Sequence, residues 1–305
     1  MFEKVFSYMF LSYVLMDKEK EESVKTKKTK SKKTRSRRTD EEKEKIVERL
    51  VVMDDAMFEA MCQSPDFVQE LLQVVLNEPK LRIKPKSLVA QKSVKNLRGR
   101  SIRMDAYVEG ENDRVFNIEV QKADDCNHVK RVRYNASLIT AHNSEPGDDF
   151  DDVQTLCMIY LSKKDIFGKG RTVYHVQNMI KETKDVVDNG LVEIYVNAEV
   201  NDGSNISALM GVFQKKELDD KDRDKFPKTY EKFNNLKHDK EEVSKMCELI
   251  EKYARDHAEE YAIRSAIKSL DDAHVAKKKI IRIVIKQFSI TKEDAESYYN
   301  AFSEK

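Results

Sequence analysis

Two stretches in the middle of the chain alternate apolar and polar residues, as β-strands with one buried side do. In the first, residues 102–108, apolar side chains at the even positions alternate with Arg103, Asp105 and Tyr107. In the second, residues 115–122, the odd positions carry Glu119 and Gln121 on one face. A period of two residues predicts two strands, and the polar, glycine-containing segment between them predicts an antiparallel hairpin.

This hairpin is expected to bring carboxylates together. In any register that follows the pleat, Asp105 lies beside Asn117 or Glu119. Two adjacent carboxylates repel each other unless a cation or a shared proton intervenes. Mg²⁺ prefers oxygen ligands, so Asp105, Glu119, the backbone carbonyl of Val120 and water or phosphate oxygens would fill its shell. The alternative is a solvated hairpin face, on which the acids need no metal.

Helical spacing and capping signals predict further elements on both sides of the hairpin. Helices are expected at residues 41–53, at 54–62 and from Pro65 to about 77, and again at 126–142. A continuous apolar run at 155–161 predicts a buried strand, and 173–177 and 191–197 predict two more. From about residue 201 the chain becomes helical and highly charged, with apolar faces at 243–253 and 273–288 and a last helix after Thr291.

The motif is surrounded by longer blocks of sequence that resemble one family. Asp105, thirteen residues and then Glu119-Val120-Gln121 stand within RMDAYVE and FNIEVQ. Together with DDAMFEAMCQSPDFVQELLQVVLNEP upstream and KRVRYNASLI, DIFGKGRTVYHV and LVEIYVN downstream, they resemble the PD-(D/E)XK nuclease superfamily, in its branch of recombination-promoting nucleases and transposases. The resemblance covers residues 54–197, with a weaker echo in ITKEDAESYY.

The resemblance implies an α/β, restriction-endonuclease-like core: a central mixed sheet flanked by helices, here with a helical C-terminal extension. It makes Asp105 and Glu119 the metal ligands and sets Gln121 in the place of the catalytic Lys. A Lys there offsets negative charge, whereas Gln is neutral and only forms hydrogen bonds. The branch itself often carries Gln. Lys122 points to the opposite face of a regular strand, so it could substitute only through a β-bulge.

Two further groups of residues are candidates for the same site. Relatives often use an acid from a leading helix as an extra ligand, and the sequence does not distinguish Glu59 from Glu70. On the predicted helix 126–142, Arg131, Arg133 and Tyr134 are candidates for contact with a nucleic-acid backbone. The alternative for each of these side chains is an ordinary solvated helix face.

Charge is distributed unevenly along the 305 residues. Residues 1–38 hold 12 Lys or Arg and 5 acids, and nine of the fourteen residues from Lys25 to Arg38 are basic. Such a segment lacks the apolar residues for a core, so it is expected to be disordered. It suits phosphate binding, or else serves as a solubilising tail. Residues 1–16 are largely apolar, which raises the alternative that translation starts at Met16. The sequence thus divides into an arm at 1–39, a nuclease-like domain at 40–200 and a helical region at 201–305.

The remaining chemistry is sparse. The four Cys are widely spaced and the six His form no metal-binding motif, so zinc, a disulfide framework and a small-molecule cofactor are not expected. No segment is long and apolar enough to span a membrane, and a cytoplasmic protein is expected. The hypothesis is a DNA endonuclease that uses Mg²⁺, or Mn²⁺, in transposition or recombination, with oligomerisation through the C-terminal helices as an option. The alternative is a nuclease-derived nucleic-acid-binding or assembly protein that does not cleave.

Overall fold

The computed structural model describes residues 40–94, 102–121 and 128–302. The basic arm at 1–39 and Lys122 lie outside the described residues. The sheets are formed by β1 (Val89–Val94), β2 (Ile102–Glu109), β3 (Val115–Gln121), β4 (Leu156–Ser162), β5 (Val173–Val176), β6 (Asn178–Met179), β7 (Val186–Val187) and β8 (Leu191–Asn197).

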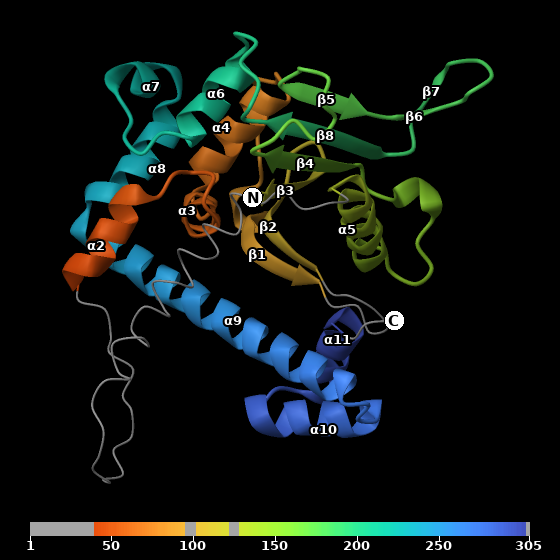
Figure 1. Ribbon diagram of the computed structural model, residues 1–305. Helices are drawn as coiled ribbons and strands as arrows, with labels where there is room; N and C mark the ends of the chain where they lie inside the picture. Colours follow the sequence, from red (N-terminus) through yellow and green to blue (C-terminus); the bar gives the residue numbers. More distant parts are fainter. Residues whose placement is uncertain (1–39, 95–101, 122–127, 303–305) are drawn as a thin grey trace.

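Six of these strands form one mixed sheet in the order β1-β2-β3-β4-β8-β5, and β6 and β7 form a separate small hairpin (Figure 1). The pairs β1–β2, β2–β3 and β5–β8 are antiparallel, whereas β3–β4 and β4–β8 are parallel. The central strand β4 is buried along its whole length, as its continuous apolar run predicts. β3 pairs antiparallel with β2 on one side and parallel with β4 on the other.

Helices cover both faces of the sheet. They are α2 (Asp40–Arg49), α3 (Asp55–Met61), α4 (Pro65–Val75), α5 (His128–Asn143), α6 (Asn205–Phe213), α7 (Asp220–Lys225), α8 (Pro227–His238), α9 (Lys240–Asp272), α10 (Lys277–Phe288) and α11 (Lys292–Phe302), with short 3-10 turns at Pro85–Ser87 and Phe150–Asp152. None of the helices in the described residues has the length and apolar character that a membrane crossing requires.

Three apolar clusters hold these layers together. The largest joins one face of the sheet to α2, α3, α4, α6, α8 and the first half of α9. A second joins the opposite face to α5. A third lies apart, where the end of α9 packs on α10 and α11 around Ile267, Ile280 and Val284. The division of the chain at residue 200 stays a prediction, although the main core continues beyond it to Ile250.

The hairpin, the strands β4, β5 and β8 and the main helices confirm the sequence-based expectations, whereas the short strands β6 and β7 were not predicted. The first two residues of the helix expected at 126–142 lie outside the described residues. Three further differences concern the ends of two helices and strand β1. The predicted helix at 41–53 ends at Arg49, because the Asp54 carboxylate accepts a hydrogen bond from the Val51 N–H and forms a turn. The helix expected at 273–288 begins only at Lys277, after His274 adopts a left-handed backbone conformation. Strand β1 was not expected, because apolar and polar residues alternate poorly in VAQKSV. In the structure this strand is mostly exposed or half-buried.

Candidate active site

Asp105 lies where the pairing of β2 with β3 stops. The antiparallel ladder runs from Glu109 opposite Val115 to Ala106 opposite Ile118 and does not continue to Asp105. Instead, the Asp105 carboxylate accepts a hydrogen bond from the Val120 N–H at 2.8 Å. Because the N–H and C=O of one strand residue point to the same neighbour, the Val120 carbonyl also faces this opening between the strands.

Strand β1 is irregular at the same level. Its pairing with β2 skips Gln91, the residue opposite Asp105, and Gln91 has a positive φ of 55°. A left-handed conformation costs a residue other than glycine about 1 to 2 kcal/mol. The Gln91 amide uses it to donate a hydrogen bond to Asp105 at 3.2 Å. Strain of this kind is concentrated at functional sites.

Glu119 lies on β3, on the face of the sheet that α5 covers. Its side chain is 8% exposed. One carboxylate oxygen accepts hydrogen bonds from the amides of Asn117, at 3.3 Å, and Asn135 of α5, at 3.1 Å. Both amides are buried, so neighbouring protein groups hold the carboxyl in place.

The two carboxyls are electrostatically coupled. Burial raises the pKa of Asp105 to about 6, against the hydrogen bond from Val120 that lowers it. Burial, followed by the negative charge of Asp105, raises the pKa of Glu119 to about 7. Both carboxyls therefore resist ionisation more than ordinary acids do, and a bound cation would relieve this.

Two buried oxygen atoms beside these carboxyls have no hydrogen-bond donor. Within the part of the chain that the structure describes, the buried side-chain oxygens or nitrogens without a partner are Gln91 Oε1 and Asn117 Oδ1. Each belongs to a side chain whose amide nitrogen donates to one of the two carboxyls. The site thus combines two carboxylates and two unsatisfied carbonyl oxygens, and this oxygen-rich donor set fits a hard cation such as Mg²⁺.

In the present conformation these oxygens are not gathered into a finished metal centre. The described ranges contain no group of three or more His, Cys, Asp or Glu side chains arranged to hold an ion. Further acids lie close by on α3. The negative charge of Asp55 raises the pKa of Asp105, and the charges of Asp105 and Glu59 add to burial in raising the pKa of the Cys62 thiol.

The structure separates the two candidate extra acids. Glu59 is buried on α3, near enough to Cys62 and Asp105 to share their electrostatic environment, and it is hydrogen-bonded to Tyr253 of α9. Glu70 instead accepts hydrogen bonds from the Thr229 N–H and hydroxyl, each at 2.7 Å, and from the Lys228 N–H at 3.1 Å. Glu70 thus stabilises the first turn of α8, and Glu59 is the one beside the site.

Gln121 and Arg131 are in contact. The Arg131 guanidinium, on the first turns of α5, donates a hydrogen bond to Gln121 Oε1. Its positive charge partly offsets the rise in the pKa of Glu119 that burial and Asp105 cause. From the sequence, Arg131 is a candidate for contact with a nucleic-acid backbone, and that contact stays a prediction. Its contact with Gln121 was not predicted, because no spacing rule relates a strand residue to a residue on the following helix. Arg133 and Tyr134 are exposed on α5, and their proposed contact with nucleic acid stays a prediction.

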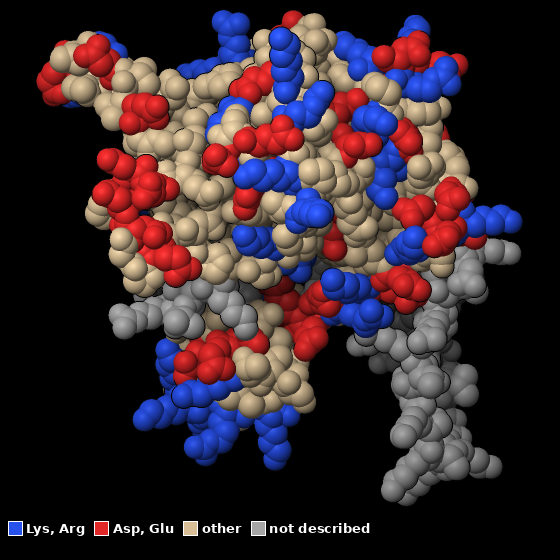
Figure 2. Space-filling view, turned by 180° about the vertical axis from the view of Figure 1, so that it is seen from behind, with Lys and Arg blue, Asp and Glu red and all other residues tan. Residues whose placement is uncertain are grey.

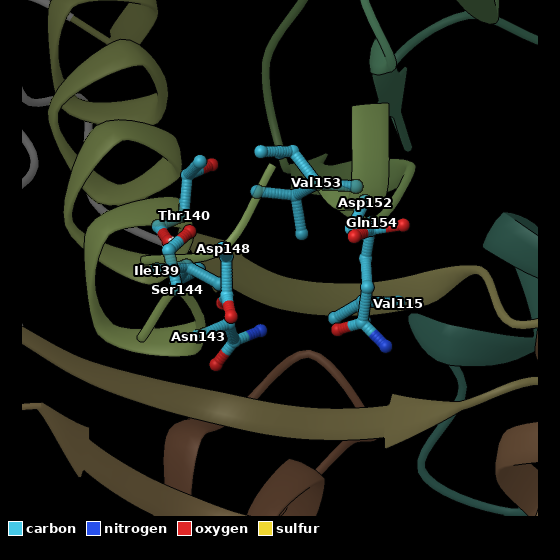
Figure 3. A pocket seen from close by; sticks show the side chains of 10 residues that line it. Val115, Ile139, Thr140, Asn143, Ser144, Asp148, Asp152, Val153 and Gln154 are labelled. Atoms are coloured by element: carbon cyan, nitrogen blue, oxygen red, sulfur yellow. Dashed lines mark hydrogen bonds between the residues drawn. The ribbon is translucent and has the colours of Figure 1, made fainter. Parts of the chain in front are cut away.

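A small cavity lies elsewhere and takes no part in this site. It is bounded by Ile139 and Asn143 of α5, by the loop with Asp148 and Val153, and by Val115 at the start of β3 (Figure 3). Its volume of about 20 Å³ holds roughly one water molecule. Glu119 is four residues further along the strand, about 13 Å away.

The mixed sheet with helices on both faces, and a pair of coupled carboxyls where two of its strands separate, define a restriction-endonuclease-like protein. Over residues 55–280 the chain matches the family described as PD-(D/E)XK nuclease family transposase, and it belongs to that family. Membership supports a nuclease or transposase-like role. No curated protein and no solved structure matched the chain.

Proposed function

We propose that this protein is a DNA endonuclease that depends on Mg²⁺ or Mn²⁺ and hydrolyses phosphodiester bonds in transposition or recombination. The proposal rests on family membership and on one feature of the site. That feature is the surplus of oxygen acceptors around Asp105 and Glu119, which includes the unsatisfied oxygens of Gln91 and Asn117. A divalent cation supplies the positive charge that these groups lack.

The residues that would hold the metal are Asp105, Glu119 and the carbonyl of Val120. A bound Mg²⁺ would supply Lewis-acid chemistry, by polarising a phosphodiester oxygen and lowering the pKa of the attacking water. Asn117 and Asn135 fix the Glu119 carboxylate, and the Val120 N–H fixes that of Asp105. Glu59 is the candidate for an additional acidic ligand or for a base that orients water.

Arg131 compensates for the neutral Gln121 in this proposal. The guanidinium holds a permanent positive charge, and its hydrogen bond to Gln121 Oε1 keeps that charge beside Glu119. This hydrogen bond also holds the Gln121 side chain in place beside Glu119. The pair would therefore divide between two side chains what a single Lys does elsewhere in the superfamily.

The test is cleavage of supercoiled plasmid by the purified full chain in Mg²⁺, in Mn²⁺ and in EDTA. Nicking is expected in the presence of either metal and not in EDTA. Asp105→Asn and Glu119→Gln keep the shape of the side chains and remove their charge, so each is expected to lower the rate by at least about 100-fold. Unchanged cleavage in either variant would refute the assignment of the site.

Matched controls come from the same hairpin. Glu111→Gln and Asp113→Asn remove the same charges at the turn between β2 and β3, where both side chains are exposed. These controls are expected to cleave at the rate of the wild type. The second candidate is a nuclease-derived binding protein, in keeping with the absence of an assembled cluster of metal-binding side chains in the described part of the chain. DNA binding with no nicking in any metal would favour it.

A further inference from the structure

Helix α10 carries a row of cations on the side opposite its buried residues. Successive residues of an α-helix are rotated by about 100°, so Lys278, Lys279, Arg282 and Lys286 fall within about one third of the helix circumference. All four are exposed. We call these four side chains the α10 cationic stripe. Figure 2 shows Lys and Arg side chains gathered at this end of the molecule.

The opposite side of α10 is part of a core. Ile280 and Val284 are fully buried against the end of α9 and against α11, and Ile281 is 7% exposed. This core holds the helix in place, so the stripe is a fixed surface and not a loose tail. Lys277, the remaining cation of the helix, donates a hydrogen bond to Asn300 of α11 and lies over the ring of Tyr299.

Ion pairing distinguishes the stripe from other cations in the described part of the protein. α10 itself has no Asp or Glu among its twelve residues. Within the described residues, no ion pair joins any of the four stripe cations to an acid. By contrast, many cations of the main body are paired, as Lys232 is with Glu242 and Lys215 with Asp222. Unpaired like charges on adjacent turns repel each other by a few tenths of a kcal/mol per pair, which an anionic partner would relieve.

We infer that the α10 cationic stripe binds the phosphate backbone of double-stranded DNA. The choice of DNA as the polyanion rests on the proposed function; the existence of an anion-binding surface does not. An anionic membrane is the other polyanion to consider. A helix that inserts into a membrane surface needs an apolar face free to enter the lipid. The apolar face of α10 is buried in its own core, so only the charges of the stripe could contact a membrane.

The stripe lies at a distance from the candidate active site that suits a second contact on the same duplex. Helix α9 connects the two regions: its Tyr253 is bonded to Glu59, and its Ile267 packs in the core that supports α10. Fourteen residues of helix separate Tyr253 from Ile267, a rise of about 20 Å. The family match ends at residue 280, so two of the four stripe residues, Arg282 and Lys286, do not belong to the segment that defines the family.

The test measures binding of a labelled duplex of about 30 base pairs in EDTA, across about 50 to 200 mM salt. EDTA prevents cleavage, so the result does not depend on whether the protein is a nuclease. In the variant with Lys278, Lys279, Arg282 and Lys286 all changed to Ala, affinity is expected to fall by at least tenfold at low salt. The slope of log affinity against log salt should become shallower by up to about 3.6, or about 0.9 for each phosphate that the variant no longer neutralises.

The matched control changes Lys169, Arg171, Lys181 and Lys221 to Ala, which removes the same charge from exposed positions elsewhere. It should keep the wild-type slope. A variant with the three stripe lysines changed to Arg should also keep it, and circular dichroism checks that α10 still folds. Equal affinity and slope in the stripe variant and the wild type would refute the inference. The inference would also be refuted if the stripe variant lost binding to vesicles that contain phosphatidylserine but kept its binding to DNA, because the surface would then be a membrane contact.

Discussion

The candidate active site and the α10 cationic stripe are opposite in both charge and environment. Around Asp105 and Glu119, carboxyls and unsatisfied carbonyl oxygens are enclosed by the protein, and burial holds the pKa of both acids high. On α10, cations are exposed and no described acid pairs with them. The first environment favours a small cation, because these oxygens have too few hydrogen-bond donors. The second favours a large, solvated polyanion, and the metal-dependent DNA endonuclease that we propose would use both.

The sharpest exception to this contrast is Arg131, a cation placed beside the anionic site. If its charge replaces that of the catalytic Lys, Arg131→Ala is expected to lower single-turnover cleavage by about 10²-fold to 10³-fold, as loss of one transition-state donor does. Arg131→Lys should keep part of the rate. Adding Gln121→Lys to Arg131→Ala should restore most of it, since the charge returns to the position typical of the superfamily.

The control for this experiment is Arg133→Ala, two residues after Arg131 on α5. Arg133 is exposed and has no hydrogen bond to Gln121 in the described structure. If Arg133 binds a phosphate, its removal should weaken DNA binding and leave the single-turnover rate at saturating DNA unchanged. Equal rates for Arg131→Ala and the wild type would mean that the charge of Arg131 takes no part in cleavage.

The raised pKa values of the two carboxyls predict a pH-dependent stability. Folded protein holds protons on Asp105 up to about pH 6 and on Glu119 up to about pH 7, whereas the unfolded chain releases them near pH 4. The stabilisation of the folded state by these two protons is therefore complete below about pH 4, and it is lost as the pH rises to about 7. The expected loss is on the order of 3 kcal/mol of unfolding free energy for each carboxyl.

Urea unfolding at several pH values measures this effect, with EDTA present. The double variant Asp105→Asn, Glu119→Gln should show a smaller fall between pH 4 and 7, and the difference from the wild type isolates the two groups. Mg²⁺ or Mn²⁺ should stabilise the wild type more at pH 8 than at pH 5, because the metal replaces the protons. Identical pH profiles for the wild type and the double variant would contradict the burial of these charges.

The sequence predicted those features of the fold and of the site that depend on residues close together in the chain. The alternation at 102–108 and 115–121 correctly predicts the hairpin, and Ser64 with Pro65 correctly predicts the start of α4, where Ser64 caps the helix. Period and capping are properties of neighbouring residues, so one sequence is enough to predict them.

Contacts that depend on distant segments were not predictable in this way. Glu59 and Glu70 are both acids on short helices, and only the packing of α8 on α4 assigns Glu70 to the Thr229 backbone. The strained Gln91 lies in a strand with no alternation, and its role arises from its position opposite Asp105. The hydrogen bond between Arg131 and Gln121 requires α5 to return along the sheet after β3.

The smallest effect concerns the interaction of Lys278 and Lys286 with the partial charges at the two ends of α10. A helix N-terminus carries partial positive charge and the C-terminus partial negative charge. Lys278 lies in the first turn, where its charge is unfavourable, and Lys286 lies in the last turn, where it is favourable. Lys278→Gln is therefore expected to stabilise α10, and Lys286→Gln to destabilise it, each by about 0.3 to 1 kcal/mol at low salt.

Hydrogen exchange of the α10 amides measures these changes, because it reports local opening of the C-terminal helices separately from the main core. DNA binding should respond differently: both variants remove one cation from the stripe, so both should weaken binding and reduce the salt slope by about 0.9. If the two variants change helix stability in opposite directions but both weaken DNA binding, Lys278 lowers the stability of α10 and contributes to the binding of DNA. If Lys278→Gln left DNA affinity unchanged while stabilising the helix, the unfavourable charge would have no such explanation, and the stripe would be reduced to its remaining three members.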